Sequence, residues 1–145
     1  EPYVIEYNVR LGDPETQVIL PRIENDIVEL FNSFKDQTLN KHQIRLSANY
    51  IVNVVLAVEG YPGSYKKDIN LSINGTSENS ILFHAGTSIN DGQLKTSGGR
   101  VMSVCGIGKT LNEAVQNAYM MTEQVVFNEK YYRKDIGKDI ISYCK

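Results

Sequence analysis

The fold of this chain of 145 residues is decided by residues 48–59, which read ANYIVNVVLAVE. Ile and Val dominate the stretch, and β-branched side chains of this kind fit the half-buried surface of a sheet. The turn residues Gly60-Tyr61-Pro62-Gly63 follow at once, and such residues end a strand. We therefore predict that Ala48–Glu59 is a central strand of a β-sheet.

Short apolar runs after this strand predict the rest of the sheet. The triplet Asn90-Asp91-Gly92 is a hairpin signal, because Asp-Gly suits the tight turns that join antiparallel strands. The short links between the runs favour antiparallel pairing throughout. The candidate strands are Ile69–Ile73, Ile81–His84, Leu94–Thr96 and Val101–Cys105.

A long helix is predicted after the last of these strands. Thr110 and Glu113 have the spacing of a capping box. Apolar residues then recur at steps of three and four, which is typical of an amphipathic helix, and Met120 is expected to fill the core as well. Strands followed by a helix predict an α+β fold, in which a mainly antiparallel sheet is covered by the helix. The expected apolar stripe consists of Leu111, Ala114, Val115, Ala118, Met121 and Val125.

The start of the chain has an alternating pattern of its own. Residues 4–10 read VIEYNVR, which predicts a strand whose apolar side chains, Tyr3, Ile5, Tyr7 and Val9, face a core. The strand should stop at Gly12. Asp13 then resembles an N-cap, followed by proline at the first position of a short helix over Pro14–Leu20.

A second helix and a linker should follow. Apolar residues recur at helical spacing from Ile23 to Phe34, which predicts an amphipathic helix of about three turns. The polar stretch Lys35–His42 is interpreted as a linker to the sheet. We expect a boundary there, between a first unit over residues 1–40 and a second over residues 41–145.

Three polar residues of the first predicted strand form a candidate site. Glu6, Asn8 and Arg10 would share one face of the strand. A carboxylate and an amide oxygen suit a hard cation such as Mg²⁺, and the planar guanidinium of Arg10 suits a phosphate or carboxylate. Alternating polar residues are also what a solvated sheet face has, so both interpretations stay open from spacing alone.

The same residues carry a resemblance to a known family. Residues 6–17, EYNVRLGDPETQ, resemble the metal-binding end of the phosphoribosylamine–glycine ligase (glycinamide ribonucleotide synthetase) family, which belongs to the ATP-grasp superfamily. Later motifs resemble the C-terminal domain of that family, in the same order along almost the whole chain, so the resemblance implies that residues 1–40 are the C-terminal end of the ATP-grasp domain and residues 41–145 the family's C-terminal domain. These motifs are GYPGSYK (60–66), FHAGT (83–87), GGRV (98–101) and YRKDIG (132–137). The chain departs from the family pattern at Leu11, Asp68 and Lys134, and none of these is a proposed ligand.

The resemblance implies an activity and roles for individual residues. Members of the family use ATP to phosphorylate glycine, and the amine of 5-phosphoribosylamine then attacks the acyl phosphate to give glycinamide ribonucleotide, an early step of purine synthesis. Glu6 and Asn8 would bind Mg²⁺ (or Mn²⁺), and Arg10 would be a catalytic clamp on phosphoryl or substrate oxygens. Asp13 and Glu15 would bind substrate, although Asp13 alternatively only caps its helix.

The second unit offers further candidates. Gly98-Gly99-Arg100 could present backbone N–H groups and a guanidinium to an anion, so Arg100 is a candidate substrate-binding residue; a tight turn with a solvated arginine is the alternative. His84 could contact substrate, although a lone histidine is more often structural. Residues 131–135 are expected to pack the tail onto the sheet.

Composition excludes some classes of protein. The chain is 41% hydrophobic and 22% charged with a net charge of −2, and it lacks the basic stripe of a nucleic-acid-binding protein. It has no apolar run of the about 18 residues that span a bilayer, so no membrane partner is expected and the resemblance implies a cytoplasmic protein. Cys105 is expected to be a buried small hydrophobe, and Cys144 to lie in the tail.

Two other functions remain as alternatives: another ATP-grasp carboxylate–amine ligase, or a non-catalytic binding module. The abrupt start at Glu1-Pro2 suggests a fragment. We expect the rest of the ligase upstream of Glu1, including the adenine pocket and phosphate loop, and therefore no ligase activity from these residues alone.

Overall fold

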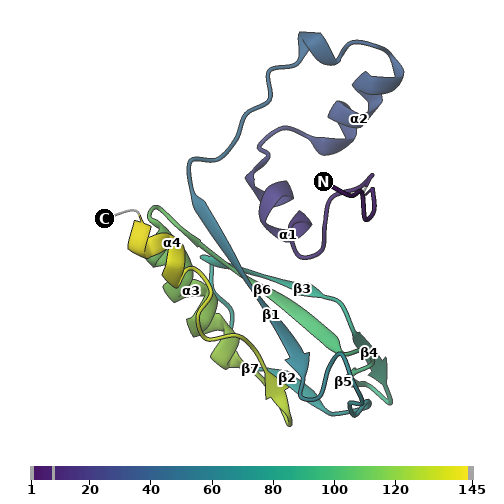
Figure 1. The fold of residues 1–145 in the computed structure, drawn as a ribbon, viewed down its shortest axis with the longest axis vertical. Helices are drawn as coiled ribbons and strands as arrows, with labels where there is room; N and C mark the ends of the chain where they lie inside the picture. The colour runs from purple at the N-terminus through teal and green to yellow at the C-terminus, as the bar shows by residue number, and fades with distance from the viewer. Residues whose placement is uncertain (1, 8, 144–145) are drawn as a thin grey trace.

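The computed structural model describes residues 2–7 and 9–143, and its centre is an antiparallel sheet (Figure 1). In this described part the sheet has the strand order β3-β6-β1-β8. The strands are β1 (Tyr50–Val58), β3 (Ser80–His84), β6 (Arg100–Gly108) and β8 (Lys130–Tyr131). The predicted central strand is confirmed, because β1 lies inside the sheet between β6 and β8.

The two long strands β1 and β6 run side by side along almost their whole length. Val54 is paired with Val104 and Asn53 with Cys105, and the register shifts between Leu56 and Ala57. Because side chains alternate along a strand, the Val54 and Val104 face differs from the Asn53 and Cys105 face. The first face carries the core, together with Leu56 and Met102, which are fully buried.

The helix α3 (Leu111–Gln124) covers that first face. Thr110 caps it as predicted, because its hydroxyl accepts a hydrogen bond from the Glu113 amide at 3.2 Å. The Glu113 carboxylate reaches back one residue further than the usual box and accepts from the Lys109 amide at 2.8 Å. The predicted stripe is buried at Ala114, Ala118 and Met121, whereas Met120 is 61% exposed, so its assignment to the core was wrong.

Two small ribbons complete the second unit. The predicted hairpin is present as β4 (Thr87–Asn90) and β5 (Gln93–Thr96), with both Asp91 and Gly92 at positive φ in the turn. The short strand β2 (Leu71–Ile73) pairs with β7 (Val125–Phe127), which begins directly where α3 ends. The tail forms α4 (Lys138–Tyr143). These elements agree with the predicted α+β fold.

The first unit differs from the prediction at its start. Among residues 2–7 and 9–11 the structure has no strand, and the apolar side chains expected in a core are exposed: Tyr3 82%, Ile5 96%, Tyr7 82% and Val9 95%. A strand requires ladder pairing with a neighbouring strand, and no strand pairing is assigned to the described residues of this segment. The strand prediction is therefore wrong for this structure.

The helices of the first unit are shorter than predicted. The helix α1 spans Thr16–Ile19 and continues as the 3₁₀ turn η1 (Leu20–Arg22), which contains Pro21. The helix α2 (Ile27–Lys35) begins four residues late, because Asp26 caps it by accepting from the Val28 and Glu29 amides. The predicted linker contains one further 3₁₀ turn, η2 (Leu39–Lys41).

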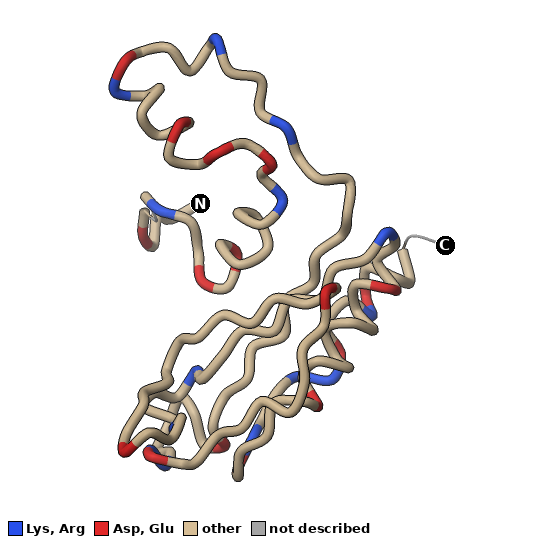
Figure 2. The backbone as a smooth tube through the Cα atoms, turned by 180° about the vertical axis from the view of Figure 1, so that it is seen from behind, with Lys and Arg blue, Asp and Glu red and all other residues tan. Residues whose placement is uncertain are grey.

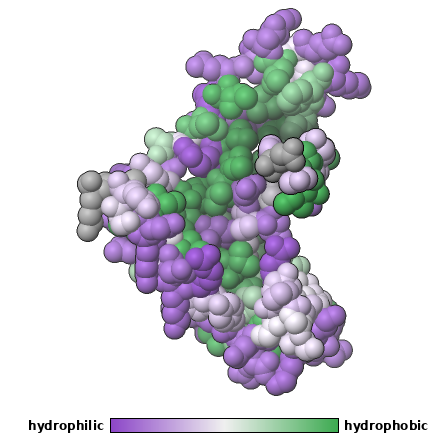
Figure 3. All heavy atoms as spheres, viewed as in Figure 1, coloured by the Kyte–Doolittle hydropathy of each residue, from purple (hydrophilic) through white to green (hydrophobic). Residues whose placement is uncertain are grey.

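Apolar side chains are more exposed in the first unit than in the second. Figure 3 shows apolar residues gathered on the surface around α2 and the N-terminal segment, and Phe31 and Phe34 of α2 are 62% and 60% exposed. Charges of both signs are scattered over the molecule (Figure 2). None of the helices in the described part is long and apolar enough to cross a membrane.

Candidate functional site

The turn at residues 12–17 connects the N-terminal segment to α1. The carbonyl of Gly12 accepts from both the amide and the hydroxyl of Thr16, at 2.9 and 2.8 Å. The Glu15 carboxylate folds back and accepts from the Gly12 amide at 3.2 Å. Glu15 occupies the N-cap position and α1 starts at Thr16, so the prediction that Asp13 is the N-cap was wrong.

Asp13 is used instead as a bridge to the second unit. Its carboxylate forms an ion pair with the Arg100 guanidinium at 3.2 Å, and their side chains are 48% and 45% exposed. The same carboxylate accepts from Nε2 of Gln17 at 3.1 Å. Arg100 is the first residue of β6. The structure thus brings together two residues that were predicted separately as substrate-binding and that lie 87 positions apart in the sequence.

The sheet contacts this turn at two more points, neither of which was predicted from the sequence. The amide of Asn53 donates to the Pro14 carbonyl at 3.3 Å, and the Cys105 thiol donates to the Gln17 carbonyl at 3.3 Å. Both side chains lie on the sheet face opposite α3. One feature of the sequence could have indicated the Asn53 contact. Asn53 lies inside an Ile/Val-rich strand, where a polar side chain requires a hydrogen-bond partner.

Burial sets the chemistry of the Cys105 thiol. The residue is fully buried, as predicted, and removal from solvent raises the pKa of its thiol to about 12. A thiolate is the reactive form of cysteine, so this side chain acts as a small apolar group and weak donor. Cys144 lies outside the described residues.

Three motifs of the second unit meet near Arg100. Gly86 and Gly98 approach so closely that a Cβ on Gly86 would lie 2.7 Å from the Gly98 Cα. The ring of Tyr61 covers Gly99 in the same way, since a Cβ there would lie 2.1 Å from the ring. The glycines of the predicted anion-binding turn are therefore required for backbone and ring contacts. His84 is exposed and its Nδ1 is 2.9 Å from the Thr87 hydroxyl.

The predicted metal and phosphate ligands belong to the N-terminal segment of the sequence. Glu6 and Arg10 lie in the segment without a strand, and Arg10 donates to the neighbouring Leu11 carbonyl at 3.1 Å. Asn8 falls outside the described residues. Among the residues that the structure does describe, no group of three or more His, Cys, Asp and Glu side chains is arranged to hold a metal ion.

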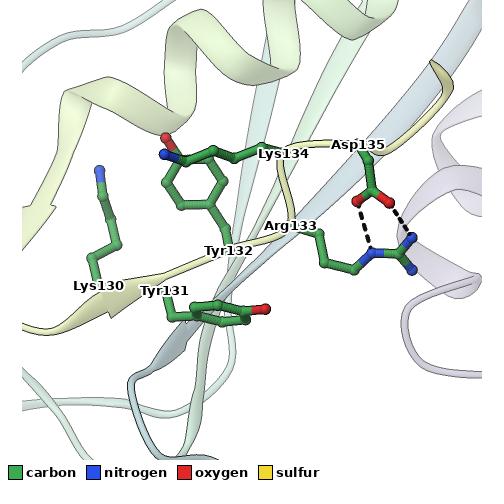
Figure 4. Close-up of a pocket in the computed structure, with 6 residues that line it drawn as sticks. All are labelled: Lys130, Tyr131, Tyr132, Arg133, Lys134 and Asp135. Carbon is green, nitrogen blue, oxygen red and sulfur yellow. Dashed lines mark hydrogen bonds and ion pairs between the residues drawn. The ribbon is translucent and has the colours of Figure 1, made fainter.

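A surface pocket of about 680 Å³ is lined by residues 130–135 (Figure 4). Several of its polar groups are engaged within the protein: Arg133 makes a two-point contact with Asp135 at 3.0 and 2.8 Å, and Lys130 donates to the Thr122 and Val125 carbonyls. The hydrogen bond from Arg133 lowers the pKa of Asp135. Within residues 131–135, Tyr131 pairs with Ala57 of β1 and Tyr132 packs against the core, in agreement with the prediction that this stretch packs the tail onto the sheet.

Comparison with known proteins decides the family. The model of the family described as "Phosphoribosylglycinamide synthetase, C domain" matches residues 51–139. The chain belongs to this family. The match covers the sheet, α3 and part of the tail, whereas the turn at residues 12–17 lies before the C domain match.

Relatives extend the similarity to the first unit. The chain is 43% identical over 138 residues to the phosphoribosylamine–glycine ligase of Pasteurella multocida, covering 94% of the chain and 32% of that enzyme. It is 41% identical over 139 residues to a bifunctional purine biosynthetic protein of Pichia angusta, of which it covers 18%. The crystal structure of phosphoribosylamine–glycine ligase from Thermotoga maritima matches with a TM-score of 0.73 and 38% identity, over 94% of the chain and 34% of that structure. The chain thus spans about a third of the length of these ligases.

Proposed function

We propose that this chain forms one wall of the active site of an ATP-dependent ligase that joins glycine to 5-phosphoribosylamine. The observation that carries the proposal is the similarity along 94% of the chain to phosphoribosylamine–glycine ligases, which includes both the turn at residues 12–17 and the C domain. In the proposed reaction, ATP phosphorylates the glycine carboxylate, and the amine of 5-phosphoribosylamine displaces phosphate from the glycyl phosphate. A cytoplasmic location stays a prediction.

The main physical demand of such a reaction is control of negative charge. Phosphoryl transfer gathers charge on the oxygens of the transferring group, and positive groups placed beforehand lower the barrier. We assign Arg10 to this role, since its guanidinium is exposed at the end of the segment that precedes the turn. A planar guanidinium makes two parallel hydrogen bonds to such oxygens.

The donor set at residues 6 and 8 fits a hard divalent cation. Glu6 is exposed and would supply a carboxylate oxygen, and Asn8 would supply an amide oxygen; both are donor types that Mg²⁺ or Mn²⁺ accepts. The ion, when bound, would neutralise charge on the ATP phosphates. Further ligands would come from the substrate and from the remainder of a complete ligase.

We assign Asp13, Glu15 and Arg100 to the substrate side of the site. Arg100 keeps about half of its side chain exposed while it is paired with Asp13, so it can reach an anionic group of the substrate as well. Glu15 is exposed on the same turn, where its carboxylate would orient the ammonium of glycine or the incoming amine.

The proposal is tested in a complete ligase that carries this chain. We expect ADP formation that requires ATP, glycine and 5-phosphoribosylamine together, and no such activity from residues 1–145 alone. Glu6→Gln should lower turnover strongly by removing one ligand charge, and Arg10→Lys should lower catalytic efficiency about tenfold, equivalent to roughly 1.4 kcal/mol. Tyr7→Phe is the matched control and should have little effect. ADP formation that does not depend on 5-phosphoribosylamine would overturn the assignment.

A further inference from the structure

Three side chains of the sheet hold the turn at residues 12–17 to one face of the C domain. Arg100 pairs with Asp13 at 3.2 Å, Asn53 donates to the Pro14 carbonyl at 3.3 Å, and Cys105 donates to the Gln17 carbonyl at 3.3 Å. The three contacts lie along the turn in sequence order, from its start to the first residues of α1. They fix both its position and its direction.

The three side chains come from neighbouring strands. Asn53 of β1 and Cys105 of β6 are directly paired in the register, and Arg100 begins β6. These strands are held from the other side by α3, whose residues Ala114 and Ala118 are fully buried. Side chains on a rigid sheet define a position better than side chains on a loop, so this face is a suitable platform for the turn.

The contact between α1 and the sheet contains buried polar atoms. The amide oxygens Oδ1 of Asn53 and Oε1 of Gln17 are buried and have no hydrogen-bond partner among the described residues. A buried acceptor left unpaired costs about 1–3 kcal/mol, and an apolar residue at position 53 would avoid that cost. An asparagine at this place is therefore poorly explained by stability alone.

We propose that Asn53 is a positioning residue, which together with the Asp13–Arg100 ion pair holds the turn so that Asp13, Glu15 and Arg100 are presented to the substrate. The role in turnover rests on the proposed ligase function, whereas the role in holding the turn does not. Misplacement of reacting groups by about 1 Å can cost on the order of a hundredfold in rate, so loss of the Asn53 contact should be visible in kinetics even though Asn53 touches no substrate.

The chain offers a matched control on the opposite face of the same sheet. Asn117 of α3 also donates its amide to a backbone carbonyl, that of Ile107 at 2.7 Å. Asn53→Ala and Asn117→Ala each remove one asparagine-to-carbonyl hydrogen bond. Only the first of these bonds involves the turn.

The first measurement is amide hydrogen exchange of residues 12–18 in the 145-residue chain. We expect Asn53→Ala to speed exchange there about tenfold, Arg100→Met to speed it about two- to fivefold because the ion pair is half-exposed, and Asn117→Ala to leave it unchanged. Because Arg100→Met changes only a half-exposed side chain, we expect this variant to fold. It therefore still tests the proposal if Asn53→Ala does not fold. Unchanged exchange of this segment in both variants would overturn the proposal.

The second measurement is kinetic and uses a complete ligase that carries this chain. We expect Asn53→Ala to lower kcat/KM for 5-phosphoribosylamine tenfold or more, and Arg100→Lys to recover most of what Arg100→Met loses. Asn117→Ala should match the wild type. Equal kinetics of the Asn53→Ala and Asn117→Ala enzymes would overturn the positioning role. An inactive wild-type enzyme would instead contradict the proposed function, and hydrogen exchange would still decide whether the turn is held.

Discussion

At the scale of single residues, the role of Asp13 depends on residues distant in the sequence, whereas that of Cys105 follows from its own strand. Asp13 has the sequence context of a helix cap, but its carboxylate is taken by Arg100 and Gln17, and Glu15 takes the cap position. Cys105 behaves as predicted because burial in a central strand is a local property of an apolar run. The ion pair could not be predicted, because it joins residues far apart in the chain.

The buried thiol of Cys105 gives a residue-scale prediction. With a pKa of about 12, only about 10⁻⁴ of the thiol is ionised at about pH 8, compared with roughly a quarter for an ordinary cysteine. In a Cys144→Ser background, a thiol reagent should therefore modify the folded chain about a thousandfold more slowly than the chain in urea. Asn53→Ala should raise the folded rate by loosening α1. A folded rate within tenfold of the unfolded rate would contradict this account.

At the scale of elements, β6 and α3 approach each other closely at Gly106. A Cβ on Gly106 would lie 2.1 Å from the Ala118 amide nitrogen and 2.2 Å from the Ala114 carbonyl oxygen. Both atoms belong to the backbone of a capped helix and cannot rotate away. The small residues Gly106, Ala114 and Ala118 therefore set the distance between helix and sheet.

Gly106→Ala should force α3 away from the sheet. We expect a loss of about 1–3 kcal/mol in the free energy of unfolding, as for other overpacked cores, measured by urea denaturation. Gly75→Ala is the control, since a Cβ there would lie 3.4 Å from the flexible side chain of Gln124 and should change stability little. Equal midpoints for the two variants would mean that α3 is not seated as closely as the structure has it.

Elements were predictable from sequence where local pattern and tertiary contact agree. The strand β1, the hairpin at Asp91-Gly92 and the capped helix α3 each carry their own signal and each has a partner nearby. The helix α2 was predicted too long, because Asp26 and Glu29 already had the spacing of a cap that was overlooked. The alternation in residues 4–10 predicted a strand, but alternation says nothing about where the pairing strand is.

The candidate site was predictable only in part for the same reason. Motifs identified Asp13, Glu15 and Arg100, and the structure brings Asp13 and Arg100 into contact. Asn53 was missed, because its role depends on which backbone carbonyl lies opposite it. The assignments of Glu6, Asn8 and Arg10 to metal and phosphate stay predictions.

At the scale of the whole molecule, the two units differ in how far their apolar side chains are buried. The sheet and α3 bury their apolar side chains in a continuous core. The first unit leaves large apolar residues in solvent, both in the N-terminal segment and on α2. Relatives about three times as long as the chain share both units.

The uncovered side chains at the start of the chain have a consequence for its behaviour in solution. Contiguous exposed apolar surface favours aggregation, and a net charge of −2 gives little repulsion between copies. The 145-residue chain should therefore bind the dye ANS and elute from a sizing column earlier as its concentration rises. Replacing Ile5 and Val9, which are 96% and 95% exposed, by Glu should suppress both effects. As a control, the same two charges are added by replacing the exposed polar residues Asn74 and Thr76 with Glu. This pair should suppress dye binding and self-association much less, because it leaves the apolar surface in place. Equal suppression by the two pairs would mean that net charge controls the self-association.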